Sequence, residues 1–318
     1  MIYTRIISTG TYLPEKVLAN DELEKIVNTS DDWIRSRTGI ESRHIAADGE
    51  FTSHLAEKAA YKALEAAGLV PADIDLIVVG TCTPDRMFPN VACLLQERMG
   101  ITGPAFSLEA ACSGFVYALT VADQFLCSGK LKRALVIGAE TMSRLIDWTD
   151  RETCVLFGDG AGAVILEASH EPGLLYSDLG ADGQHRKLLY TETGLSNMES
   201  SVEGHLKMKG NEVFKVAVRT LESMVDKVLM ENNLNKGQID WLVPHQANLR
   251  IISATAKRLG LSMDRVVVTV NKHGNTSAAS IPMALDTAVR DGRIKRGNLI
   301  LLEAFGGGFT WGACLLRY

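Results

Sequence analysis

The sequence predicts an α/β protein made of two similar halves, and three observations carry this prediction. Short apolar runs typical of buried strands alternate with helical patterns along the whole chain. Two pairs of stretches resemble each other at a nearly constant offset. The chain has 318 residues, of which 46% are hydrophobic, so it can bury a large core in one or two domains.

Six apolar runs are expected to be buried strands, and two segments are expected to be helices. The helix at 54–68 ends on Gly68, a residue that favours the left-handed conformation of a helix C-cap. The helix at 210–233 carries its apolar residues on one stripe. The expected strands lie at residues 75–80, 133–139, 161–167, 240–245, 265–270 and 298–305.

An internal repeat organises these elements. Residues 72–85 resemble 237–250, where Thr81 is matched to His245 at an offset of 164, and residues 128–140 resemble 291–306, where Lys132 is matched to Lys295 at an offset of 163. Near-equal offsets indicate one α/β unit used twice, although chance similarity between buried-strand patterns would look the same. The repeat places Cys112 near Asn275, so we expect both at equivalent strand-to-helix turns that face each other across a pseudo-twofold axis.

Composition and charge narrow the function classes. The net charge of −5 does not favour a nucleic-acid partner, and no apolar run reaches the ~18 residues of a membrane span. The first ten residues do not read as a signal peptide, so a cytoplasmic location without a membrane partner is expected. The six cysteines are scattered without a C-x-x-C pair, which favours neither disulfides nor a metal site.

Cys112 is the strongest candidate for a catalytic nucleophile. Small residues surround it, Gly114 follows two positions on, and a very apolar helical pattern comes next. This combination permits a sharp turn that presents the sulfur at a helix N-terminus, where free N–H groups favour the thiolate and can hold an oxyanion. The other cysteines are interpreted as small buried hydrophobic residues. Cys93 and Cys127 lie in helical patterns, and Cys154 and Cys314 lie in strand-like runs. Cys82 ends an expected strand, but the residues around it do not favour a sharp turn of the kind expected at Cys112.

His245 and Asn275 are the candidate partners of the cysteine. His245 ends an apolar run and is expected to open a helix, whose N-terminus would keep the imidazole neutral. A core or capping histidine is the alternative. Asn275 follows Gly274 in a run of small residues, where an N-cap role would be the simplest explanation. Its expected equivalence to Cys112 favours a functional role. The glycine runs at 158–162 and 306–308 do not fit nucleotide-phosphate motifs.

These residues and their contexts resemble the β-ketoacyl-acyl-carrier-protein synthase III family over essentially the whole chain. The matching motifs are SDDWIRSRTGI (30–40), AACSGF around Cys112, FGDGAGA (157–163), VPHQANLRI (243–251), HGNTSAAS (273–280) and EAFGGGFTWG (303–312). The resemblance implies a thiolase-like five-layer αβαβα fold of two duplicated halves related by pseudo-twofold symmetry, with residues 1–170 carrying Cys112 and residues 171–318 carrying His245 and Asn275. It also implies a homodimer.

The resemblance implies a two-step reaction without a cofactor. Cys112 takes an acetyl or other short acyl group from coenzyme A, which is a substrate. Malonyl-acyl-carrier protein then loses CO2, and its carbanion attacks the acyl-enzyme to give a 3-oxoacyl chain on the carrier protein. Two neutral donors, His245 and Asn275, suit the enolate that forms on decarboxylation. The N–H groups of Cys112 and Gly307 would form the oxyanion hole.

Further roles follow only from the resemblance. Trp33 and Arg151 would hold the coenzyme adenine between them, with Arg37 and Asn248 assisting. Phe157 would line the acyl pocket, and Phe88 would reach that of the partner subunit. Carrier-protein contacts are implied for Gln246, Ala247, Asn248, Leu249 and Arg250, with Lys215, Lys257 and Arg258 as further candidates for a basic patch.

Three other interpretations remain at this point. Papain-like proteases share the chain order Cys–His–Asn, but they carry a different signature around the cysteine. A non-catalytic thioester-binding protein could use the same fold. A condensing enzyme of secondary metabolism with a different primer would share the three residues. The match extends over residues 246–250, for which carrier-protein contacts are implied. We therefore expect the enzyme to initiate fatty acid synthesis, and the sequence does not determine its primer.

Overall fold

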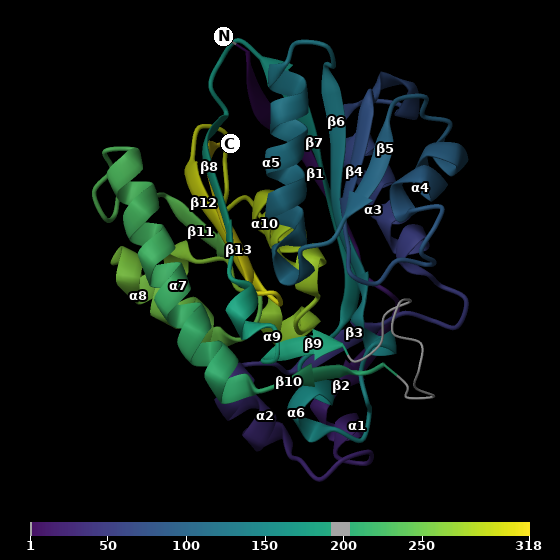
Figure 1. Cartoon of the computed structure of the whole chain (residues 1–318), viewed down its shortest axis with the longest axis vertical. Helices are drawn as coiled ribbons and strands as arrows, with labels where there is room; N and C mark the ends of the chain where they lie inside the picture. Colours follow the sequence, from purple (N-terminus) through teal and green to yellow (C-terminus); the bar gives the residue numbers. More distant parts are fainter. Residues whose placement is uncertain (1, 192–203) are drawn as a thin grey trace.

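Two β-sheets form the framework of the computed structural model, which describes residues 2–191 and 204–318 (Figure 1). The first sheet has the order β1-β7-β6-β4-β5. In it β6 is parallel to β4 and β4 to β5, whereas β1 and β7 pair antiparallel. Its strands are β1 (Tyr3–Tyr12), β4 (Leu76–Gly80), β5 (Ala105–Leu108), β6 (Arg133–Thr141) and β7 (Asp159–Ser169).

The second sheet repeats this plan with the order β8-β13-β12-β11. Again one pair of neighbouring strands, the edge strand β11 and the inner strand β12, is parallel, and β13 pairs antiparallel with both of its neighbours. All strands of the first sheet precede residue 170, and all strands of the second follow it. They are β8 (Leu174–Ala181), β11 (Trp241–Pro244), β12 (Leu299–Gly306) and β13 (Thr310–Arg317).

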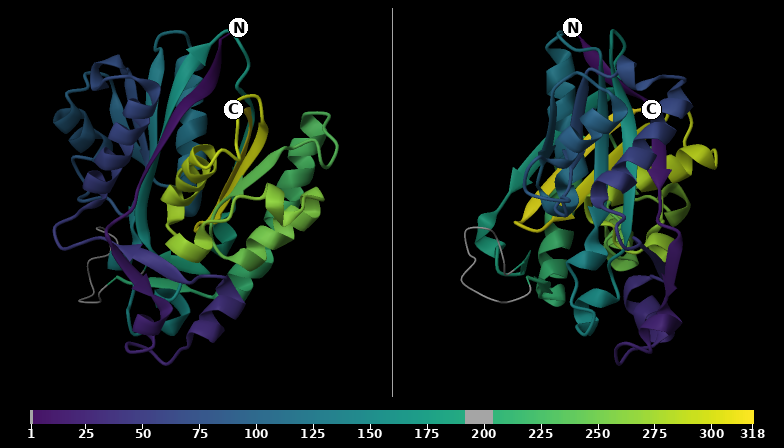
Figure 2. Two further views of the ribbon diagram at one scale, coloured as in Figure 1. Left: turned by 180° about the vertical axis from the view of Figure 1, so that it is seen from behind. Right: turned by 90° about the vertical axis from the view of Figure 1, so that its right-hand side faces the viewer.

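Helices cover both sheets and fill the space between them, which gives the five layers (Figures 1 and 2). Helices α3 (Thr52–Ala67) and α4 (Val91–Met99) cover the outer face of the first sheet. Helices α5 (Gly114–Cys127) and α10 (Ser280–Arg290) lie between the sheets. The outer face of the second sheet is covered by α7 (Gly210–Glu231) and α8 (Leu249–Leu259).

The continuous apolar runs follow from this layering. In β4, Ile77 and Val79 face the outer helices, whereas Leu76 and Val78 face α5 and α10. A strand buried on both faces has no polar side, so the helix–strand alternation and the apolar strands of the sequence are confirmed. The helix expected at 54–68 is α3 with Gly68 as its left-handed C-cap, and that expected at 210–233 is α7.

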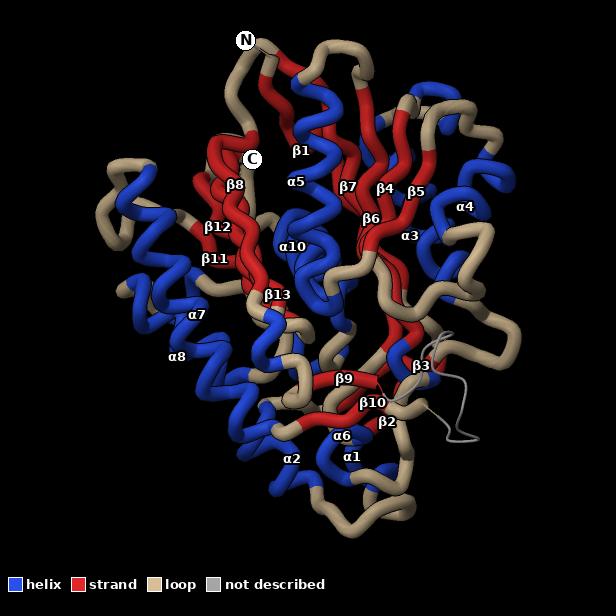
Figure 3. The backbone as a smooth tube through the Cα atoms, viewed as in Figure 1, coloured by secondary structure: helices blue, strands red, loops and turns tan. Residues whose placement is uncertain are grey.

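The strand expected at 265–270 is wrong except for one bridge. β11, which contains Leu242, is the edge strand of the second sheet (Figure 3). Val266 pairs with Leu242, in the place that β5 takes in the first sheet, and a short helix α9 (Val270–His273) follows (Figure 1). The reason is the buried side chain of Gln246. Its amide oxygen accepts the N–H groups of Thr269 (2.8 Å) and Val270 (3.1 Å), and its amide nitrogen donates to the Val267 carbonyl (3.0 Å). Backbone groups that a strand would use are therefore occupied.

Short elements below the sheets close one end of the molecule (Figure 1). The Arg43 side chain is completely buried there and donates to the carbonyls of Leu18 and Val155 and to the Asn20 side chain. Helix α6 (Arg151–Cys154) contains Cys154, so the strand expected around that cysteine is wrong. The remaining short elements are α1 (Asn20–Leu23), α2 (Asp31–Thr38), β2 (Lys16–Ala19), β3 (Ser42–Ile45), β9 (Leu189–Thr191) and β10 (Leu206–Met208). In the ranges 2–191 and 204–318, we find no helix that is both long and apolar enough to span a membrane.

Candidate active site

A cavity of about 540 Å³ contains the three residues that the sequence singles out. Cys112, His245 and Asn275 all line it, although they lie on three separate segments. Cys112 lies on a connection of the first sheet, and His245 and Asn275 lie on connections of the second. Cys112 follows β5, His245 follows β11, and Asn275 follows the segment at Val266 that takes the place of β5 in the second sheet. All three therefore lie beyond the carboxyl ends of parallel strands, where ligands of parallel sheets bind. The part of the chain that the structure describes has no cluster of three or more metal-ligating side chains.

The turn that carries Cys112 is strained and tightly packed. Ala111 adopts a left-handed conformation with φ of 45°, which is costly for a residue with a side chain. Glu109 accepts a hydrogen bond from the Ala111 N–H at 2.7 Å, and this bond supports the turn. On the other side Gly306 lies so close that a Cβ there would be 2.7 Å from the Cys112 nitrogen. The sharp turn expected from the sequence is confirmed, and Gly306 leaves room for it.

The expected preference of Cys112 for the thiolate is wrong for the buried position that the structure gives this residue. Burial raises the pKa of the Cys112 thiol to about 12, against a favourable contribution from the Ser277 hydroxyl. Desolvation disfavours the charged form, and here it outweighs the N-terminus of α5. Cys112 therefore rests as a thiol, so deprotonation has to accompany the attack on a substrate.

His245 is held as a neutral hydrogen-bond donor. It follows β11, but α8 begins only at Leu249 with Asn248 as its N-cap, so the expected position at the start of a helix is wrong. Burial instead lowers the pKa of His245 to about 3. Its Nδ1 lies 2.7 Å from the Ser280 hydroxyl, which also accepts the Gln246 N–H. The Ser280 hydroxyl can accept from Gln246 and donate its own hydrogen to Nδ1, and this arrangement leaves Nε2–H for the cavity.

Asn275 is oriented by its own turn. Its side-chain oxygen accepts the Ser277 N–H at 2.9 Å, so the amide oxygen is engaged and the NH₂ group remains as a donor. The backbone of Asn275 bridges to Phe157, with the Asn275 N–H donating to the Leu156 carbonyl at 2.8 Å. The cavity thus has two uncharged donors near one buried sulfur.

The equivalence expected between Cys112 and Asn275 holds for the turns but not for the residues. A short 3₁₀ turn precedes α5 at Ala111–Ser113, and another precedes α10 at Ser277–Ala279. Their first residues share the left-handed conformation, with φ of 45° and 48°. Cys112 therefore corresponds to Ala278, and Asn275 lies three positions before that residue.

A buried polar network lies behind the nucleophile. Glu140 is fully buried and accepts hydrogen bonds from Thr83 (2.5 Å) and Ser277 (3.1 Å). Its Oε1 also lies 3.3 Å from the Cys82 sulfur. Burial raises the pKa of Glu140, and also raises that of Cys82. Cys82 does not line the cavity, which agrees with its rejection as the nucleophile.

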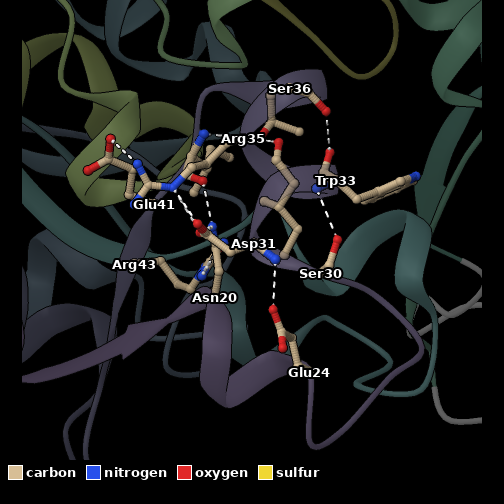
Figure 4. A network of polar contacts seen from close by, with 12 residues as sticks. Asn20, Glu24, Ser30, Asp31, Trp33, Arg35, Ser36, Glu41 and Arg43 are labelled. Carbon is tan, nitrogen blue, oxygen red and sulfur yellow. Dashed lines mark hydrogen bonds and ion pairs between the residues drawn. The ribbon is translucent and has the colours of Figure 1, made fainter.

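The cavity mouth carries the expected Trp33–arginine cluster. The guanidinium of Arg151 lies 4.7 Å from the Trp33 ring centre and that of Arg37 lies 4.9 Å away, so both stack on the indole. Trp33 sits on α2, whose N-cap Ser30 accepts the Trp33 N–H at 3.2 Å (Figure 4). All three residues line the cavity.

The structure divides the residues considered for a carrier-protein surface. Gln246 is buried and its side chain is used internally, so that expectation is wrong for its side chain. Asn248 caps α8 by accepting the Ile251 N–H at 3.0 Å, and it lines the cavity with Ala247. Arg250 stacks on Phe214 at 4.9 Å.

The remaining candidates for that surface lie on the outer helices. Lys215 and Lys257 are exposed, whereas Leu249 packs against Gly39. Arg258 forms an ion pair with Asp226, so its charge is already balanced. Of the expected basic residues, Arg250, Lys215 and Lys257 are therefore exposed and available to an acidic partner.

Three further predicted residues have different surroundings. Phe157 is buried and lines the cavity. Phe88 is 84% exposed, so within this chain it contacts little. Gly307 lies against Ala111 and Leu189, whereas Gly306 is the glycine packed on the Cys112 nitrogen.

Two residues of the site were missed by sequence reasoning. Ser280 was read only as a small residue, and nothing in its local sequence indicates that it reaches the imidazole of His245. Glu303 lines the cavity and is 1% exposed. A carboxyl group inside the apolar run 298–305 is an available signal, because carboxylates are rarely buried without a reason.

Comparison with known proteins gives one consistent result. Residues 106–183 match the family described as 3-oxoacyl-[acyl-carrier-protein] synthase III, and residues 229–318 match its C-terminal part. The β-ketoacyl-[acyl-carrier-protein] synthase III of Thiobacillus denitrificans is 61% identical over 320 residues, covering 100% of both chains. That of Xanthomonas campestris pv. campestris is 62% identical over 321 residues, covering 100% of this chain and 99% of its own.

Solved structures agree with the sequence matches. The 3-oxoacyl-[acyl-carrier-protein] synthase III of Aquifex aeolicus superposes with a TM-score of 0.94 at 49% identity, covering 99% of this chain and 100% of that one. The Thermus thermophilus enzyme also gives 0.94, at 43% identity and 99% coverage of both chains. Fold and site therefore define an acyltransferase of the condensing type.

More narrowly, the chain belongs to the β-ketoacyl-acyl-carrier-protein synthase III family, which carries out the initiating condensation of fatty acid biosynthesis. The thiolase-like fold expected from the motifs is confirmed. The protease interpretation fails, because neither the fold nor any of these relatives is that of a protease.

Proposed function

We propose that this chain condenses a short acyl group, held on Cys112, with malonyl-acyl-carrier protein. The observation that carries the proposal is that Cys112, His245 and Asn275 line one cavity. The products are a 3-oxoacyl-acyl-carrier protein, CO2 and coenzyme A. A coenzyme A thioester is a substrate here, and the proposed steps use no cofactor.

In the first step the Cys112 sulfur attacks the thioester carbonyl of the acyl-coenzyme A. The new C–S bond forms as the bond to the coenzyme sulfur breaks, and the thiol proton passes to the departing sulfur. A thiol whose pKa is raised to about 12 fits this exchange, since no free thiolate has to persist in the cavity. Backbone N–H groups at the Cys112 turn hold the oxyanion, with Gly307 as the proposed second donor.

In the second step the malonyl thioester loses CO2. Electrons of the breaking C–C bond form an enolate, whose oxygen accepts hydrogen bonds from His245 Nε2–H and the Asn275 NH₂ group. The enolate carbon then attacks the acyl carbonyl on Cys112, and the sulfur leaves as a thiolate that takes up one proton from solvent to restore the thiol. Because burial lowers the pKa of His245 to about 3, the imidazole stays neutral and stabilises charge without transferring a proton.

The mouth of the cavity would bind the coenzyme and the carrier protein. Trp33 and Arg151 would receive the adenine between them, with Arg37 and Asn248 nearby. In this structure Arg151 stacks directly on Trp33, so it has to move aside. Arg250, Lys215 and Lys257 would face the acidic carrier protein, where opposite charge raises the association rate.

The assembly and setting of the enzyme are also part of the proposal. Phe88, exposed in one chain, would be covered in a homodimer and line the acyl pocket of the partner subunit, as Phe157 lines the local one. Residues 1–170 and 171–318 would be the two duplicated halves, and the enzyme would act in the cytoplasm.

The test is the mass of the intact protein after incubation with acetyl-coenzyme A. An increase by one acetyl group that maps to the peptide containing Cys112 is expected, and Cys112→Ala should remain unmodified. Product assays with malonyl-acyl-carrier protein and primers of increasing length would then distinguish acetyl from longer or branched acyl groups. Full condensation by Cys112→Ala, or acetylation of another cysteine, would refute the nucleophile assignment.

A further inference from the structure

Glu303 is a buried acid in the catalytic cavity for which the proposed steps have no use. It lies within β12, opposite the last residue of β11, it is 1% exposed, and its side chain lines the same cavity as Cys112 and His245. The Thr255 hydroxyl approaches the carboxyl closely enough to lower its pKa, but within the described residues no hydrogen bond of good geometry reaches either carboxyl oxygen. A buried carboxyl without a partner in the protein points to an interaction inside the cavity.

The backbone couples Glu303 to His245. β12 pairs Glu303 with Pro244 on one side and Ala313 on the other, and the Glu303 carbonyl accepts the His245 N–H at 2.8 Å. The end of the strand therefore places the acid beside the proposed enolate donor. α8, which packs against this sheet, faces it with the Thr255 hydroxyl.

No cation within the described residues is close enough to hold a negative charge on Glu303. The titratable groups that share the inner cavity are the Cys112 thiol and the neutral His245 imidazole. Burial therefore raises the pKa of Glu303 to about 8, because a carboxylate without a cation loses its hydration. The charged groups that line the mouth of the cavity are Arg37, Arg151, Glu152, Lys209, Glu212 and Arg250.

We propose that Glu303 serves the condensation step as a neutral acid, which keeps the inner cavity free of negative charge and offers one O–H donor there. This inference rests on the proposed function. A malonyl thioester brings its own carboxylate into the cavity, and decarboxylation then turns that charge into an enolate. An ionised Glu303 would repel both species, since two carboxylates in one poorly solvated site oppose each other.

The two half-reactions should therefore respond differently to alkaline pH. Acyl transfer begins with an uncharged acyl group and gains from deprotonation of Cys112, so its rate should rise with pH. Condensation should fall by about tenfold per pH unit above pH ~8, as expected when one group must stay protonated. Glu303→Gln, which has the same shape and no charge, should keep the neutral-pH rate within about threefold and lose the alkaline fall.

The experiment measures both half-reactions between pH 6.5 and 9.5, on wild type, Glu303→Gln and Glu152→Gln. Acylation is followed by intact mass with acetyl-coenzyme A. Condensation is followed in a single turnover of acetylated enzyme with malonyl-coenzyme A carrying a labelled carboxyl group. Glu152 is an exposed carboxylate at the mouth, so its variant should keep the wild-type midpoint.

The outcomes separate the two proposals. An alkaline fall in Glu303→Gln with the wild-type midpoint, or a loss above tenfold at pH 7 in the folded variant, overturns the role of Glu303. Failure of the wild type to become acetylated on Cys112 overturns the proposed function instead. If Glu303→Gln does not fold, infrared difference spectra of the wild type decide. They should show a protonated carboxyl band at pH 7 that disappears with the midpoint of activity, and its absence at pH 7 refutes the proposal.

Discussion

Glu109 and Asn275 occupy the same place in the two halves of the molecule. Each accepts a hydrogen bond from the N–H two residues further on, Glu109 from Ala111 at 2.7 Å and Asn275 from Ser277 at 2.9 Å. In both cases the donor residue is left-handed, with φ of 45° and 48°. The two halves thus contain equivalent strained turns, and each turn is supported by the same kind of side-chain-to-backbone hydrogen bond.

The side chains of Glu109 and Asn275 differ in the hydrogen-bond donors that remain after each has accepted its bond. The Glu109 side chain has no donor, whereas an amide that accepts through its oxygen still has two N–H groups. Asn275 therefore supports its turn and presents a donor to the cavity with one side chain. The N-cap role considered for Asn275 is wrong, because Thr276 is the N-cap residue of the 3₁₀ turn, but support of the turn and a functional role are compatible in this one side chain.

Replacing Asn275 by Asp separates those two roles. Asp keeps an acceptor for the Ser277 N–H, so the turn should persist, but it removes the donor and adds a negative charge. Loss of one preorganised donor costs about 10²–10³ in rate at comparable sites, so malonyl decarboxylation should fall by at least that factor. The measurement is release of labelled CO2 from malonyl-coenzyme A.

Glu109→Gln is the matched control for this variant. It also keeps its acceptor, and it sits at the equivalent turn without facing the enolate. Its decarboxylation rate should stay within about threefold of wild type, since a surface change without strain has small effects. Equal rate losses in Asn275→Asp and Glu109→Gln would show that only the turn matters and would exclude a donor role for Asn275.

Gly306→Ala should displace the backbone turn at Cys112 through a steric clash. A Cβ at position 306 would lie 2.7 Å from the Cys112 nitrogen and 3.0 Å from the Ser113 nitrogen, so the turn has to shift. Displacement of this kind near reacting atoms costs about 10²-fold in rate, and we expect acetylation of Cys112 to fall by that factor. Gly183→Ala, where a Cβ meets nothing within 4 Å, should acetylate normally. A wild-type rate in Gly306→Ala would contradict the packing argument.

Periodicity predicted the layers of this fold well, because strands buried on both faces need continuous apolar runs. β4, β6 and β12 and the helices α3 and α7 follow from the sequence alone. Motif resemblance added the site, since it placed Cys112, His245 and Asn275 together before any geometry was known. The cavity brings all three onto one surface.

What the sequence did not predict depends on contacts between distant side chains. The strand at 265–270 fails because Gln246, about 20 residues earlier, occupies its backbone groups. The thiolate expected at Cys112 is wrong because the local sequence indicates a helix N-terminus but not the burial of the sulfur by distant segments. Ser280 was missed for the same reason, since its partner His245 is 35 residues away.

Ser280→Ala should weaken His245 as a donor without removing it. The hydroxyl that lies 2.7 Å from Nδ1 selects the ring form with Nε2–H, and without it the proton can sit on either nitrogen. We expect decarboxylation to fall by about tenfold, which corresponds to one ordinary hydrogen bond. Acetylation of Cys112 should change less, so the ratio of the two rates is the measurement.

Two further variants identify the cause of such an effect. Ser280→Thr keeps a hydroxyl and should recover most of the rate. Thr287→Ala removes a hydroxyl from the same helix that bonds only to the Met283 carbonyl, and it should have the wild-type ratio. If Thr287→Ala matched Ser280→Ala, the effect would come from the stability of α10 and not from His245.

The buried, neutral His245 should make the folded protein sensitive to acid. Its pKa is lowered from 6.5 to about 3 in the folded state, so below pH 6.5 the unfolded chain takes up a proton that the folded protein does not. Stability is therefore undiminished above pH 6.5 and falls as the pH drops towards 3. The loss from this one group is about 2 kcal/mol at pH 5 relative to pH 8, from linkage with the unfolded pKa.

Denaturant unfolding of wild type and His245→Asn at pH 8 and pH 5 measures this contribution. Asn does not titrate, so the variant should lose about 2 kcal/mol less than wild type between the two pH values. His170→Asn changes an exposed histidine and should follow the wild type. His273 is half-buried and its pKa is lowered to about 4, chiefly by burial, so some acid sensitivity should remain in His245→Asn. Identical pH dependence in wild type and His245→Asn would mean that His245 is protonated in the folded enzyme, and the neutral-donor mechanism would then fail.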